Sequence, residues 1–151
     1  MKRFVFRYQT LLDVRERARK EEEERLQALF VKLNEVRGNL SQLERDEQAQ
    51  RDAWLSLQIE GVLPLDEVAM IQQFMTVLAR RIVVEGRALE EANARVDNQR
   101  EILSEAMRQV EVIRKLKERD ERAWRDELER LEAAELDELA TLRYAYVRRS
   151  V

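Results

Sequence analysis

The chain has 151 residues, of which 39% are charged and only 6% aromatic, with three glycines and one proline. So few loop-forming residues argue against a chain that folds back on itself many times. The net charge of −3 argues against a nucleic-acid partner, which would require a strongly basic surface. The absence of cysteine and histidine excludes disulfides, thiolate nucleophiles and the usual zinc sites.

The N-terminal segment is basic, but it does not have the apolar run of a signal peptide. Arg7, Gln9 and Asp13 interrupt the apolar residues there. No other stretch approaches the roughly 18 apolar residues that a membrane-spanning helix needs. We therefore expect a cytoplasmic protein that does not insert into a membrane.

A first helix is predicted over residues of about 4–60. From Leu12 onward its apolar residues repeat every seven positions, which indicates a coiled-coil seam. Between Val14 and Arg25 the repeat lapses, because Arg19 and Glu22 occupy seam positions, and this segment is predicted to be solvated and loosely paired. The two sets of seam residues are Leu12, Leu26, Leu33, Leu40 and Trp54, and Leu29, Val36, Leu43 and Leu57.

A turn at about 61–65 separates this helix from a second one, predicted over about 66–147. Gly61 and Pro64 mark the turn, and Asp66 and Glu67 give the second helix the acidic first turn that its dipole favours. Its seam residues are Ile71 and Leu78 at one position and Met75, Ile82, Leu89, Val96, Leu103 and Val110 at the other.

Matching the two seams predicts one domain, residues 1–151, with an all-α fold. Two long helices form an antiparallel coiled-coil hairpin in which Leu33 lies beside Val96, and the second helix extends past the first. Gly38 and Gly86 are predicted to be tolerated inside the helices. The alternative is a compact four-helix bundle with breaks at these two glycines.

The extension runs from about residue 121 to the C-terminus and has no predicted partner within the chain. One broad face of it is apolar, over roughly 40 Å of helix, and a face of this kind is typical of a protein interface. Alternatively, the extension bends back or pairs with a second chain, as in a passive homodimeric scaffold. The residues of the face are Trp124, Leu128, Leu131, Leu139, Leu142 and Tyr146, with Leu136 beside them.

The sequence offers no recognisable catalytic, nucleotide, cofactor or metal site. Its glycines are isolated and do not form a phosphate-binding loop. The run Glu21–Glu24 cannot converge on one cation, because consecutive helical residues point about 100° apart. We expect a non-enzyme without cofactors.

Three motifs resemble the flagellar FliJ family of coiled-coil export proteins. The first is the opening Phe4-x-Phe6-Arg7-Tyr8-Gln9-x-Leu11-Leu12-Asp13-x-Arg15-Glu16. The second is Gln72-Gln73-Phe74-x-x-x-Leu78-x-x-x-Ile82, early in the second helix. The third is Lys117-x-x-Asp120-Glu121-Arg122-Ala123-Trp124.

This resemblance implies a stalk that couples the export ATPase ring to the export gate, a membrane protein. It also implies a monomer that is peripherally associated with the membrane-embedded export apparatus, and a general chaperone role towards export chaperones. By position, the ATPase-binding end comprises Phe6, Leu11, Leu12 and Arg15 together with the apolar extension. The residues that match the gate-binding face are Phe74 and Leu78, followed by Arg81 and Glu85, which differ from the family in size and charge. The equivalent stalk of a virulence injectisome is the nearest alternative.

Overall fold

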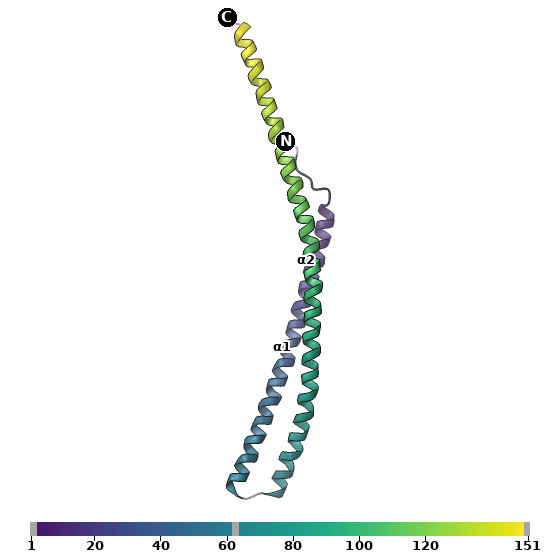
Figure 1. The fold of residues 1–151 in the computed structure, drawn as a ribbon, viewed down its shortest axis with the longest axis vertical. Helices are drawn as coiled ribbons and strands as arrows, with labels where there is room; N and C mark the ends of the chain where they lie inside the picture. The colour runs from purple at the N-terminus through teal and green to yellow at the C-terminus, as the bar shows by residue number, and fades with distance from the viewer. Residues whose placement is uncertain (1–2, 62–63, 150–151) are drawn as a thin grey trace. The chain divides into compact units, whose positions relative to one another are not determined.

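The computed structural model describes residues 3–61 and 64–149, and its regular structure consists of two helices (Figure 1). Helix α1 spans Gln9–Glu60 and helix α2 spans Leu65–Arg149, with no strand in the described part of the chain. The two helices pack against each other, which confirms the predicted all-α coiled-coil hairpin. Val62 and Leu63 of the predicted turn lie outside the described residues, as do Met1, Lys2, Ser150 and Val151.

Helix α1 begins at Gln9 rather than at about residue 4, so the predicted start is wrong. Residues 3–8, which we call the N-terminal strap, precede the helix. The strap is rich in aromatic residues, which are poor helix formers. Its Phe6 is buried against α2, with 5% of its surface exposed. This burial favours the extended strap over another turn of α1.

Helix α2 begins directly after Pro64. The backbone N–H of Val68 donates to the carbonyl oxygen of Pro64 at 3.0 Å, which is the first hydrogen bond of the helix. Asp66 and Glu67 lie in the first turn, as predicted, and Arg148 and Arg149 lie in the last. Both groups have the sign of charge that the helix dipole favours.

Both helices continue without interruption through their internal glycines. Gly38 lies within α1 and Gly86 within α2. The prediction that the two glycines are tolerated is therefore confirmed. The four-helix alternative, which required breaks at both positions, is wrong.

The contacts of the chain divide into two compact units. Unit 1 comprises residues 1–19 and 105–151, and unit 2 comprises residues 20–104. In unit 1 the core consists of Phe6 and Leu12 together with Val110 and Ile113 of α2. Polar contacts flank this core: Arg114 donates to the carboxylate of Glu16 at 2.7 Å, and Lys117 donates to Oε1 of Gln9 at 2.8 Å. That the whole chain behaves as one domain stays a prediction.

Unit 2 is held by a seam of apolar residues with one polar layer. Leu33 and Val96, which the register pairs, are both buried, and the Arg100 guanidinium lies 5.2 Å from the centre of the Phe30 ring. The polar layer is Gln99, whose amide donates to the backbone carbonyl of Glu22 at 3.1 Å and also to its carboxylate. The segment predicted to pair loosely therefore makes a specific pairing at Glu22.

Candidate protein-binding surfaces

The four residues of α1 and the strap that were assigned to the ATPase-binding end occupy two different environments. Phe6 and Leu12 are buried in the core of unit 1, so they support a surface rather than form one. Leu11 and Arg15 are exposed, and the Arg15 guanidinium donates to Oε1 of Gln109. Of these four residues, Leu11 and Arg15 are the ones that a partner can reach in this structure.

Trp124 is half-buried, although the sequence placed it on an uncovered extension. Its ring lies 5.8 Å from the ring of Phe4, measured between centroids and tilted by 49°. The prediction that the extension has no partner from residue 121 onward is therefore wrong at its inner end. The physical reason is the extended strap, which runs alongside α2 and places Phe4 on Trp124.

Beyond Trp124, helix α2 presents an apolar face to solvent. Leu128 is half-buried, and Leu131 is 54% exposed. Figure 1 shows this last part of α2, in yellow, with no other described segment of unit 1 beside it. Spacings of three and four residues place large side chains on one side of a helix. We define the α2 terminal face as Leu128, Leu131, Leu139, Leu142 and Tyr146, of which the last four are all more than half exposed.

The four residues that were matched to the gate-binding face are also divided. Leu78 is only 1% exposed, because it belongs to the seam of unit 2 and packs inside it. In this structure Leu78 is therefore not accessible to a partner, and its binding role stays a prediction. Phe74 is 42% exposed and accessible to a partner.

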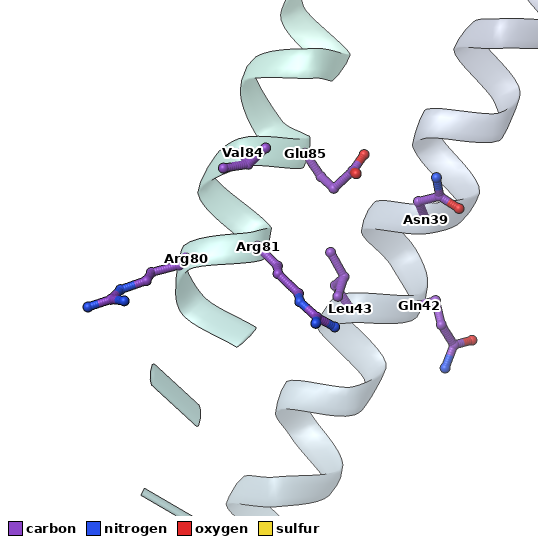
Figure 2. A pocket seen from close by; sticks show the side chains of 7 residues that line it. All are labelled: Asn39, Gln42, Leu43, Arg80, Arg81, Val84 and Glu85. Carbon is purple, nitrogen blue, oxygen red and sulfur yellow. The ribbon is translucent and has the colours of Figure 1, made fainter. Parts of the chain in front are cut away.

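Arg81 and Glu85 line a groove of about 520 Å³ in unit 2. Figure 2 shows that both side chains point from α2 toward α1, whereas Arg80 points away. Asn39, Gln42 and Leu43 form the α1 side of the groove. The lining of the groove is mixed: its polar and charged residues lie beside apolar surface from Leu43 and Val84.

An exposed apolar stripe on α2 adjoins Phe74 and was missed by the sequence reasoning. Met70, Val77 and Val84 follow one another at intervals of seven residues, and each is exposed. Met70 and Phe74 together line two shallow hollows, of about 330 and 370 Å³. The signal was present as a second seven-residue repeat beside the seam. We define the α2 stripe as Met70, Phe74, Val77 and Val84.

Both surfaces are suited to binding proteins by apolar contact. In residues 3–61 and 64–149 the structure has no group of three or more acidic side chains arranged to hold a metal ion. Within the same residues, neither helix contains a segment with the length and apolar character needed to span a membrane.

A comparison with known protein families identifies the family of the chain. The model of the family described as "Flagellar FliJ protein" matches residues 4–149. This chain belongs to the flagellar FliJ family. No curated protein and no solved structure matches it.

Membership of the FliJ family makes the chain a component of the flagellar protein export apparatus. The resemblance noted in the three sequence motifs is thus confirmed over nearly the full chain. The family description is flagellar, so it favours the flagellar system over the injectisome. A non-catalytic role fits the FliJ family.

Proposed function

We propose that this FliJ-family chain is a non-enzymatic coupling protein that binds two partners of the export apparatus through separate surfaces. The α2 terminal face in unit 1 binds the export ATPase ring. The α2 stripe, with the adjoining groove in unit 2, binds the export gate, a membrane protein. ATP hydrolysis by the ring supplies the energy, and the chain stays a peripheral component at the membrane.

The observation that carries this proposal is the α2 terminal face. Residues Leu131, Leu139 and Leu142 are each more than half exposed on the last part of α2, which has no other described segment of unit 1 beside it. Covering the exposed part of each leucine contributes about 1 kcal/mol. An exposed ion pair typically contributes less than that, so the apolar face outweighs the surrounding charges as a source of affinity.

The gate-binding surface rests on the α2 stripe. Phe74 is a large aromatic side chain beside two hollows, and aromatic residues in such positions often dominate binding energy. Arg81 and Glu85 in the adjoining groove bring one charge of each sign. A partner segment with an apolar centre and polar edges would match this surface.

The experiment measures binding of the purified full chain to the export ATPase and, separately, to the cytoplasmic part of the gate protein. Leu131→Lys is the first variant, because Glu127 and Glu135 four residues to either side keep its helix stable. We expect it to weaken ATPase binding by at least about tenfold, since the lysine must be desolvated in an apolar interface. Phe74→Glu is expected to weaken gate binding similarly.

Each variant is the matched control for the other. Leu131→Lys should bind the gate as the wild type does, and Phe74→Glu should retain ATPase binding. Circular dichroism checks that both keep their helicity. Wild-type ATPase binding by Leu131→Lys would contradict the role of the α2 terminal face. If light scattering instead shows a dimer that Leu131→Lys dissociates, the face pairs two chains, as in the homodimeric scaffold.

A further inference from the structure

The N-terminal strap makes two contacts with α2 that differ in depth. Phe6 is buried in the core of unit 1 with Leu12, Val110 and Ile113. Phe4 is only half-buried: it packs against this core and its ring lies on Trp124. Between them Val5 faces solvent and is 81% exposed. This alternation is typical of an extended segment, which places every second side chain on the same side.

The backbone of the strap is weakly held at the end that carries Phe4. The first backbone hydrogen bond joins the N–H of Gln9 to the carbonyl of Phe6 at 3.2 Å. Arg3, Phe4 and Val5 make no backbone hydrogen bond with the rest of the described chain. Phe4 can therefore leave Trp124 while Phe6 stays in the core.

Phe4 covers one end of the apolar surface that Trp124, Leu128 and Leu131 form on α2. Trp124 and Leu128 are four residues apart on α2, and Leu131 follows after three more, so the α2 terminal face continues from the covered tryptophan. A partner that covers Leu128 and Leu131 and extends one turn further along α2 meets Trp124 and, on it, Phe4. To bury Trp124 as well, the partner has to displace Phe4.

We propose that the strap is a displaceable cover, and that the partner of the α2 terminal face removes Phe4 from Trp124 and takes its place. This inference rests on the proposed function, which assigns that face to the export ATPase. The strap lowers the affinity of the free chain for its partner, and its release exposes one more large aromatic side chain to the interface.

The first test uses the chain alone with Trp124 as the only tryptophan. Trp54→Phe removes the other tryptophan, which lies in unit 2. In this background we expect Phe4→Ala to shift the emission of Trp124 to longer wavelength and to increase its quenching by acrylamide. Val5→Ala is the matched control, because Val5 lies in the same strap and faces solvent. Equal quenching of Trp124 in the two variants would overturn the proposal that Phe4 covers it.

The second test titrates the same proteins with the export ATPase. Phe4→Ala should bind about two- to tenfold more tightly than Val5→Ala, which is the range expected for losing one aromatic pair in the free state. Phe4→Leu, which keeps an apolar cover, should lie between them. Equal or weaker binding by Phe4→Ala overturns the strap proposal alone. Absence of binding by every protein, wild type included, overturns the proposed function as well.

Discussion

Gln99 is the buried polar residue of the seam, and its hydrogen bonds distinguish one pairing of the helices from others. Only 8% of its surface is exposed, and its amide donates to both the backbone and the side chain of Glu22. Leucines at intervals of seven, such as Leu26, Leu33 and Leu40, would fit almost as well after a shift of one heptad. Such a shift would leave the amide of Gln99 without its acceptors, so Gln99 disfavours the shifted register.

Replacing Gln99 by leucine should therefore destabilise the chain, although leucine is the better seam residue. Gln99→Leu removes two hydrogen bonds to Glu22 in a partly buried site, although the Glu22 carboxylate keeps its ion pair with Arg25, and this loss costs about 1–2 kcal/mol of the free energy of unfolding. In the double variant Gln99→Leu with Glu22→Leu, the stability should recover, because both polar partners are gone. Urea denaturation of the single and double variants measures this. A single variant as stable as the wild type would show that the layer does not hold the register.

At the scale of the helices, the two internal glycines lower the stability of the fold relative to alanine, and no steric reason requires a glycine at either position. A Cβ added to Gly86 or Gly38 would meet no atom within 4 Å outside its own turn. Neither glycine has a positive φ, unlike Gly61. Both lie next to residues of the groove, Asn39 and Glu85.

Gly86→Ala should accordingly stabilise the chain by about 0.5–1 kcal/mol, since alanine restricts the unfolded backbone and favours helix. Gly38→Ala provides a second, independent measurement in the other helix. Thermal unfolding followed by circular dichroism would detect the gain in both. A loss of stability in either variant would indicate that its glycine makes a close contact after all.

For the molecule as a whole, the seven-residue repeat was sufficient to predict the helices, the hairpin and the apolar face at the end of α2. It was not sufficient for the strap, because a helical repeat carries no information about a segment that is extended. Phe4, Val5 and Phe6 are all apolar, so no alternation of apolar and polar residues marks the strap as extended. The seven-residue repeat places Leu78 in the seam, which already implied that it is buried. The match to the family motif instead placed Leu78 on a binding surface. Binding roles depend on the partners, so they stay predictions.

The conformation of Gly61 affects whether the chain pairs its two helices within one molecule or exchanges them with a second molecule. Gly61 follows the last residue of α1 and adopts a φ of 69°, a left-handed conformation that costs a residue with a Cβ about 1 kcal/mol or more. If the reversal is strained, the α2 segments of two chains can exchange places and form the same seam between molecules. Gly61→Ala should raise the fraction of domain-exchanged dimer relative to Gly38→Ala, as measured by light scattering over a concentration series. A purely monomeric Gly61→Ala chain would contradict this link. The left-handed conformation of Gly61 would thus help α1 to pair with α2 of its own chain, although the two helices could pair equally well between two chains.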